Sequence, residues 1–275
     1  MSPISPVPQP ADEIFRSDHE GGRVWNFDSF SWLAPKVPLR QVIYALGAGQ
    51  EPLREQFRLL RTRLEDLRRT RSLKSILITS SLTGEGKSFV TLNLAAAVSQ
   101  RGRNKVLLLE ADLCHPSCCA ALGLSPVPGL TECCGSAEPT TSFVYRVSGL
   151  DLFLLPAGQQ PRAEMELLSS RRASQILAET SRVFDWVLID SAPLLPVADS
   201  VALSRWCDGI LLVVRRRRAL KSALREALSR IEPAKLLGIV LNDFPAHHSC
   251  KAYFQSLAEP ASGKVLGITE EKKAA

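Results

Sequence analysis

Residues 79–88, TSSLTGEGKS, combine glycine, lysine and serine in an order that suits phosphate binding. Gly84 and Gly86 permit a tight turn whose backbone N–H groups point at one centre, and a helix beginning near Lys87 adds the positive end of its dipole. Lys87 would then reach the β- and γ-phosphates of a nucleotide, and the Ser88 hydroxyl would ligate Mg²⁺. The stretch therefore predicts a nucleotide site.

Acidic residues follow two other apolar runs. Glu110 and Asp112 stand two apart at the end of one run. Because alternate strand residues share a face, both carboxylates are expected to look toward the same pocket. Asp190 ends the run WVLID, in the place of a carboxylate that holds Mg²⁺ directly or through water. Asp112, and Asp199 farther along, could instead cap the helices that follow them.

The elements that must position these residues alternate along the chain. Apolar runs at 75–79, 105–112, 151–156, 186–190, 209–214 and 236–242 are separated in several places by helix-length segments. The runs are apolar on both faces, which suits strands covered on both sides. Strand–helix–strand repetition predicts an α/β fold with a doubly wound, mostly parallel sheet. Ligands of such sheets lie at the carboxyl ends of the strands, where the lysine and the acids stand.

Residues 51–70 have a different pattern, with an apolar side chain recurring every three or four positions. This spacing predicts an amphipathic helix. Its apolar stripe is formed by Leu53, Phe57, Leu60, Leu64 and Leu67. The stripe packs either on the core of its own chain or on a neighbouring subunit.

Composition narrows the class of protein. The net charge of +6 and the pI near 9.0 allow an acidic partner such as a nucleotide, a nucleic acid or an anionic membrane face. Seven cysteines, an odd number with two adjacent pairs, do not suggest a secreted disulfide framework. Cys114, His115 and Cys118 have no regular second half of a zinc site after them. With neither a signal-peptide pattern nor a membrane-length apolar run, we expect a cytosolic protein.

Taken together, the motifs resemble those of the bacterial tyrosine kinases of exopolysaccharide and capsule systems, which are P-loop NTPases of the deviant Walker A (MinD/ParA-like) class. Their phosphate loop has no glycine at the first Walker position, where this chain has Ser81. LEADLCHP at 109–116 resembles their Walker A-prime motif, and FDWVLIDSAP at 184–193 their Walker B motif. Their oligomerisation motif, E-x-x-R-x-x-R, is matched by Glu55, Arg58 and Arg61.

The resemblance implies an ATP-dependent protein-tyrosine kinase with ATP and Mg²⁺ as cofactors. The catalytic residues it implies are Lys87, Asp112, Glu110 and Asp190. The cofactor-binding residues it implies are Thr83, Gly84, Glu85, Gly86, Lys87, Ser88, Phe89 and Asn242. The metal ligands it implies are Ser88, Asp112 and Asp190. Asn242 matches a position that contacts adenine in related ATPases, and it could equally be a cap at the end of a strand.

Three features depart from the family pattern. Glu110 stands where the family has aspartate, and Cys114 replaces the usual arginine. The tail has no tyrosine, and the three tyrosines of the chain, Tyr44, Tyr145 and Tyr253, form no cluster. ATP binding and hydrolysis are therefore better supported than autophosphorylation.

The resemblance also implies partners: a transmembrane polysaccharide co-polymerase adaptor, further copies of the chain in a homo-oligomer or ring, and protein tyrosine substrates. The expected location is cytoplasmic, peripheral at the inner face of the bacterial plasma membrane. One alternative is a MinD/ParA-like positioning ATPase that binds membrane or DNA. Leu82 stands where those proteins carry a lysine, and nucleic acid is an unlikely partner despite the run 215–218 of four arginines. Another alternative is a non-catalytic nucleotide-binding regulator of the same export system.

Four segments are expected along the chain. Residues 1–45 are Pro-rich with scattered aromatics and predict a flexible arm. Residues 46–72 hold the amphipathic helix, residues 73–258 the P-loop ATPase or kinase domain, and residues 259–275 a short polar tail.

Overall fold

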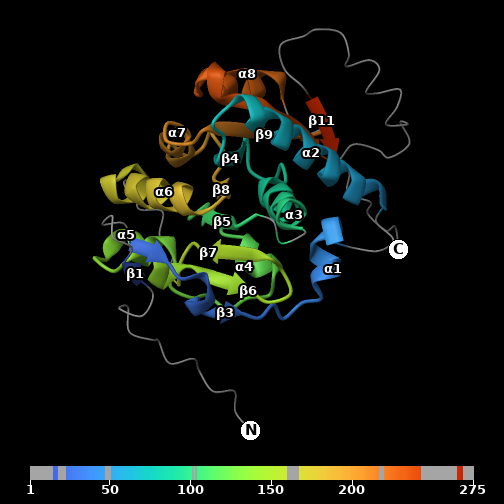
Figure 1. The fold of residues 1–275 in the computed structure, drawn as a ribbon. Coiled ribbons are helices and arrows are strands. Elements are labelled where there is room, and N and C mark those ends of the chain that lie inside the picture. The colour runs from blue at the N-terminus through green and yellow to red at the C-terminus, as the bar shows by residue number, and fades with distance from the viewer. Residues whose placement is uncertain are drawn as a thin grey trace.

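A computed structural model describes residues 15–17, 23–46, 51–100, 102, 104–159, 167–216, 220–242 and 265–268 (Figure 1). Their main element is a nine-stranded sheet in the order β11-β10-β9-β4-β8-β5-β7-β6-β3. Within this part of the chain, no helix is both long enough and apolar enough to cross a membrane.

The sheet is mostly parallel, as the alternation of apolar runs predicts. Its strands are β3 (Trp32–Leu33), β4 (Ser75–Ser80), β5 (Val106–Ala111), β6 (Tyr145–Val147), β7 (Leu152–Leu155), β8 (Trp186–Ser191), β9 (Gly209–Arg215), β10 (Leu236–Asn242) and β11 (Val265–Ile268). The exception is the pair β6 and β7, which run antiparallel, with β3 parallel to β6. A separate antiparallel pair is formed by β1 (Phe15–Ser17) and β2 (Arg23–Trp25). The central strands β4, β5 and β8 are buried throughout, which explains their unbroken apolar sequences.

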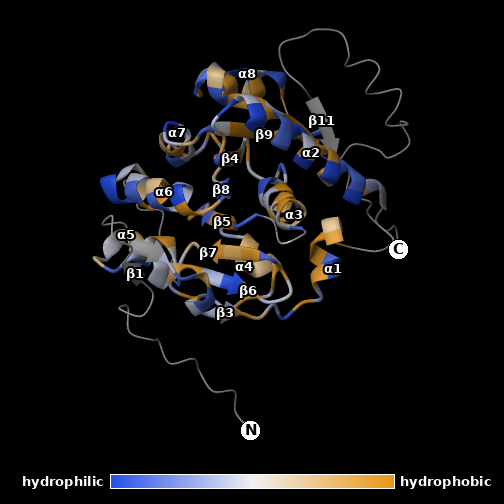
Figure 2. Cartoon of the chain, viewed as in Figure 1, coloured by the Kyte–Doolittle hydropathy of each residue, from blue (hydrophilic) through white to orange (hydrophobic). Residues whose placement is uncertain are grey.

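Helices cover both faces of the sheet. The α-helices are α1 (Leu39–Val42), α2 (Glu51–Thr70), α3 (Lys87–Ser99), α4 (Cys118–Ala121), α5 (Leu130–Gly135), α6 (Arg171–Val183), α7 (Asp199–Ser204) and α8 (Lys221–Ser229). The 3-10 turns are η2 (Phe27–Ser29), η3 (Tyr44–Leu46), η4 (Thr140–Phe143), η5 (Leu167–Ser169) and η6 (Pro233–Lys235). Buried side chains of α2 and α3 share one hydrophobic core with one face of the strands, and those of α5, α6 and α8 share another core with the opposite face. In Figure 2, α3 is apolar along most of its length, whereas α6 and α8 mix apolar and polar residues.

The amphipathic helix predicted at 51–70 is α2. Its apolar stripe packs on the core of its own chain, where Leu53, Phe57, Leu60 and Leu64 are almost fully buried and Leu67 is partly buried. The alternative expectation, that this stripe packs on a neighbouring subunit, is therefore wrong.

The N-terminal region differs from the flexible arm expected over residues 1–45. The rings of Phe27 and Phe30 lie within 6 Å, centroid to centroid, of Phe153, and Phe27 also contacts Phe184. Residues 32–33 add strand β3 to the edge of the sheet. Burial of these aromatic rings offsets the entropy of ordering the segment, so residues 23–46 are part of the folded domain.

The C-terminal region also differs from the expected polar tail. Residues 265–268 form β11, a strand parallel to β10 at the other edge of the sheet. The rest of the segment 259–275 lies outside the described residues.

Candidate nucleotide site

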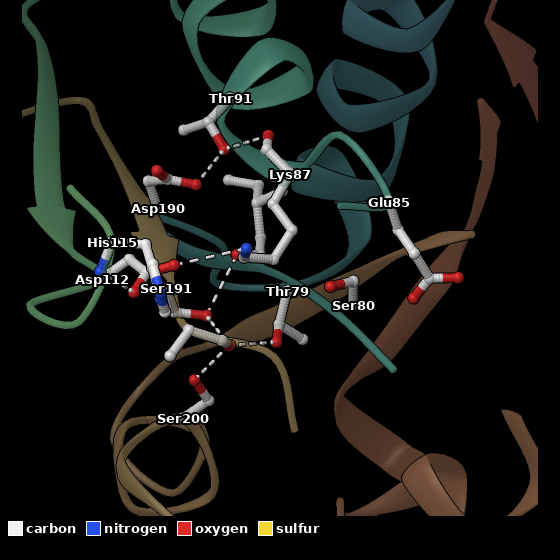
Figure 3. Close-up of polar contacts among 12 residues, drawn as sticks. Thr79, Ser80, Glu85, Lys87, Thr91, Asp112, His115, Asp190, Ser191 and Ser200 are labelled. Atoms are coloured by element: carbon white, nitrogen blue, oxygen red, sulfur yellow. Dashed lines mark hydrogen bonds and ion pairs between the residues drawn. The ribbon is translucent and has the colours of Figure 1, made fainter. Parts of the chain in front are cut away.

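The predicted phosphate loop connects β4 to α3 at the carboxyl end of the sheet (Figure 3). Gly84 and Gly86 have φ angles of 82° and 93°, a left-handed conformation that side chains with a Cβ rarely adopt. A Cβ at Gly86 would also collide with the side-chain amide of Asn242. Glycine at 86 is thus required twice, by the backbone turn and by the close approach of β10.

Lys87 begins α3 and forms a buried ion pair. Its Nζ lies 3.3 Å from Oδ2 of Asp112, and the two side chains are only 7% and 2% exposed. The other carboxylate oxygen of Asp112, Oδ1, accepts a hydrogen bond of 3.0 Å from the backbone N–H of His115. The lysine of the loop and the acid that follows β5 therefore meet directly.

Asp190, near the end of β8, is fully buried beside the first turns of α3. Its Oδ1 accepts a 3.2 Å hydrogen bond from the Thr91 hydroxyl, and its Oδ2 accepts a 3.4 Å bond from the Cys118 thiol. Burial raises the pKa of Asp190 to about 6, against the opposing effects of a hydrogen bond from Ser88 and the charge of Lys87. A cation beside this carboxylate would favour its charged form and so lower its pKa.

The Ser88 side chain lowers the pKa of Asp190, and these two residues carry the oxygen donors that Mg²⁺ prefers. Among the described residues, no group of three or more His, Cys, Asp or Glu side chains is placed to hold a metal ion. This agrees with the usual mode of Mg²⁺ binding, in which one or two protein ligands are completed by waters and substrate phosphates. The residues present fit such an ion.

Glu110, expected as a catalytic residue, is the register partner of Asp190, and its carboxylate accepts hydrogen bonds from backbone amides. Its Oε1 accepts hydrogen bonds from the backbone N–H groups of Cys118, at 2.6 Å, and Cys119, at 3.4 Å. Its Oε2 accepts a 3.3 Å bond from the N–H of Ala157. Both oxygens of this fully buried carboxylate hold the segments that follow β5 and β7, so the geometry gives Glu110 a structural place.

The side chains of Glu85 and Asn242 hold the loop itself. Glu85 is 1% exposed, and its carboxylate accepts hydrogen bonds from the N–H of Leu82, at 2.8 Å, and of Arg215, at 3.4 Å. The amide of Asn242 donates a 3.0 Å bond to the carbonyl oxygen of Glu85. These contacts tie the loop to the ends of β9 and β10.

Phe89, Thr83, Gly84 and Asp199 have different surroundings. The Phe89 ring packs against Tyr44 and Phe57, with centroids 5.6 and 6.0 Å apart, so its side chain belongs to the core under α2. Thr83 and Gly84 are exposed in the loop. Asp199 is the first residue of α7 rather than its N-cap, and burial and the charge of Asp112 raise its pKa.

The three residues of the expected oligomerisation motif do not share one environment. Glu55 and Arg58 form a 3.0 Å ion pair on the exposed face of α2, with side chains 53% and 48% exposed. Arg61 is only 13% exposed, pairs with Glu65, and donates a 3.0 Å hydrogen bond to the carbonyl oxygen of Ala97. Arg61 therefore links α2 to the end of α3 within the chain.

Sequence reasoning missed two residues that contact Asp190, namely Thr91 and Cys118. For Thr91 a signal existed, because it lies four residues after Lys87 and so on the same face of α3. For Cys118 none existed, since its contact depends on how the chain turns after β5. Burial raises the pKa of the Cys118 thiol well above its ordinary value, so the thiol is protonated and can donate.

Three comparisons with known proteins bear on this site. Residues 76–275 match the family described as the CobQ/CobB/MinD/ParA nucleotide binding domain. The tyrosine-protein kinase YwqD of Bacillus subtilis (strain 168) is 36% identical over 191 residues, which cover 68% of this chain and 80% of the relative. The crystal structure of the chimerical protein CapA2B2 superimposes with a TM-score of 0.69 at 26% identity, covering 78% of this chain and 93% of that one.

Several longer relatives share only a portion with this chain. The succinoglycan biosynthesis transport protein ExoP of Rhizobium meliloti (strain 1021) is 30% identical over 203 residues, covering 72% of this chain and 26% of the relative. The chain spans about a quarter of the length of such relatives.

The parallel sheet, the glycine turn and the lysine at the start of α3 define a nucleotide-binding P-loop domain of the MinD/ParA type. Within that class, the chain belongs to the family of bacterial tyrosine-protein kinases.

Proposed function

We propose that this chain is an ATP-dependent protein-tyrosine kinase that regulates exopolysaccharide or capsule polymerisation and export. The observation that carries the proposal is the buried contact between Lys87 and Asp112, with the charge of Lys87 also acting on the buried Asp190. In this proposal Lys87 is the phosphate-binding cation, Asp112 is the candidate base, and Ser88 and Asp190 are the Mg²⁺-binding pair. Phosphoryl transfer needs mainly such positioning and charge neutralisation.

Each residue has a defined part in this reaction. Backbone N–H groups of the loop and Lys87 bind the phosphates of ATP. Ser88 and Asp190 would hold Mg²⁺, which when bound would supply neutralisation of phosphate charge. When Lys87 turns to the phosphates, Asp112 loses its cation and becomes free to accept a proton. Asp112 takes the proton of the tyrosine hydroxyl, the phenolic oxygen bonds to the γ-phosphorus, and the bond to ADP breaks.

The acceptor tyrosine belongs to another protein chain in this proposal. The Tyr44 ring packs on Phe89, and the Tyr145 hydroxyl donates a 3.0 Å hydrogen bond to the carbonyl oxygen of Pro128. Burial raises the pKa of Tyr145 to about 12, which makes this hydroxyl a poor nucleophile. Tyr253 lies outside the described residues. We therefore expect weak autophosphorylation.

The partners follow from the same proposal. A transmembrane polysaccharide co-polymerase adaptor recruits the chain to the cytoplasmic face of the plasma membrane, and the chain forms a homo-oligomer through the exposed Glu55 and Arg58. Support comes from the relatives, one of which is named as a succinoglycan biosynthesis transport protein. Nucleic acid is not a partner in this proposal.

The test is incubation of the purified chain with γ-labelled ATP and Mg²⁺, with and without the cytoplasmic segment of such an adaptor, followed by phosphosite mapping. We expect phosphotyrosine on added protein substrate, more of it with the adaptor segment, and none with Lys87→Met. ATP binding without any phosphotyrosine product would refute the kinase and favour a nucleotide-binding regulator. Undiminished activity of Lys87→Met would refute the site.

A further inference from the structure

Cys118 lies between two buried carboxylates that neighbouring strands bring together. Glu110 on β5 and Asp190 on β8 are register partners, and both are fully buried. The backbone N–H of Cys118 donates to Glu110 at 2.6 Å, and its thiol donates to Asp190 at 3.4 Å. One residue therefore supplies a hydrogen to each of the two acids.

We propose that Cys118 is a positioning residue that orients Asp190 for Mg²⁺, and that Glu110 in turn fixes Cys118. This inference rests on the proposed function, in which Ser88 and Asp190 hold the ion. Partners that hydrogen-bond a metal-ligating carboxylate set its orientation, and their loss commonly weakens metal binding by about 10- to 100-fold.

The two oxygens of Asp190 are held unequally. The Thr91 hydroxyl has a single hydrogen, which is shared between Oδ1 of Asp190 at 3.2 Å and the carbonyl oxygen of Lys87 at 2.9 Å. The nearer acceptor competes for that hydrogen. Within the described part of the chain, the Cys118 thiol donates only to Oδ2 of Asp190, so its hydrogen is not shared with a second acceptor.

Glu110 anchors the thiol through the start of α4. Its side chain is one methylene longer than aspartate, and it accepts hydrogen bonds from the N–H groups of Cys118, Cys119 and Ala157. These bonds fix the backbone of Cys118 with respect to β5. The glutamate that departs from the family pattern thus acts through Cys118 on the metal-binding acid.

The experiment measures how strongly Mg²⁺ promotes equilibrium binding of a fluorescent, non-hydrolysable ATP analogue, so that turnover is not needed. Cys118→Ala removes the donor, and Cys118→Ser restores one. Cys207→Ala is the matched control, because Cys207 is also buried but donates to the carbonyl oxygen of Leu203. Melting of each nucleotide-free variant shows whether it is folded.

We expect Cys118→Ala to need about 10-fold more Mg²⁺ for half-maximal binding, while Cys118→Ser stays within about threefold and Cys207→Ala is unchanged. A folded Cys118→Ala with the Mg²⁺ requirement of the unmodified chain would overturn the inference and leave the kinase proposal intact. If Cys118→Ala does not fold, Cys118→Val replaces it, because valine fills the space without a donor. An unchanged Mg²⁺ requirement in folded Cys118→Val would then overturn the inference. An unmodified chain that binds the analogue equally with and without Mg²⁺ would overturn the proposed metal site, and the inference with it.

Discussion

The ion pair between Lys87 and Asp112 predicts how the nucleotide-free protein responds to Lys87→Met. Methionine keeps most of the apolar stem of lysine but removes its charge, and leaves Asp112 buried with only the N–H of His115 on Oδ1. Breaking a buried ion pair by removing one partner costs about 3–5 kcal/mol. Because one carboxylate oxygen keeps its hydrogen bond, we expect the free energy of unfolding to fall by an amount at the lower end of this range, about 3 kcal/mol. For a domain of this size that lowers the melting temperature by about 6–12 °C.

A second substitution separates this structural effect from nucleotide binding. Asp112→Asn in the Lys87→Met background removes the unpaired charge, so we expect at least half of the lost free energy of unfolding to return. Binding of Mg-ATP, measured by calorimetric titration, is expected to stay lost in both variants. Urea unfolding without nucleotide gives the free energies. If Lys87→Met is as stable as the unmodified chain, the pair does not form in the absence of nucleotide and the reasoning fails.

Further predictions concern the phosphate loop, Asp190 and helix α2. Gly86→Ala forces a side chain into a left-handed turn and is expected to cost more than about 1 kcal/mol in urea unfolding, whereas Gly135→Ala, which has open space, should cost less than that. Asp190 has a pKa of about 6 when folded and about 3.8 when unfolded, so the folded state binds more protons between these values and stability falls as pH rises through them. Without metal, this loss is about 3 kcal/mol, and Asp190→Asn should abolish it in urea titrations at several pH values. Phe57→Ala, in the core, should lower the free energy of unfolding by about 3–5 kcal/mol. Arg58→Ala, on the surface, should leave that free energy unchanged and lower only the oligomer mass seen by ultracentrifugation.

The sequence was most informative where the signal is local. The apolar runs and the glycine turn identify strands and loop without long-range knowledge, which is why the sequence predicts Lys87, Asp112 and Asp190 at the carboxyl ends of the strands. The packing of residues 23–46 could not be predicted in this way. Phe27 has its partners, Phe153 and Phe184, more than one hundred positions away, and a Pro-rich segment with scattered aromatics has no period to indicate a face.

Glu110 and Asp112 show why two acids with the same sequence signal can make different contacts. The expectation that Glu110 and Asp112 share a pocket assumes that the strand continues through both, because alternation holds only within a strand. β5 ends at Ala111, so the chain has already turned when it reaches Asp112. The carboxylate within the strand binds backbone amides, and the carboxylate beyond it reaches Lys87. The change from aspartate to glutamate therefore falls on a residue that holds the frame of the site, while Lys87, Asp112 and Asp190 keep the places that the proposed phosphoryl transfer would use.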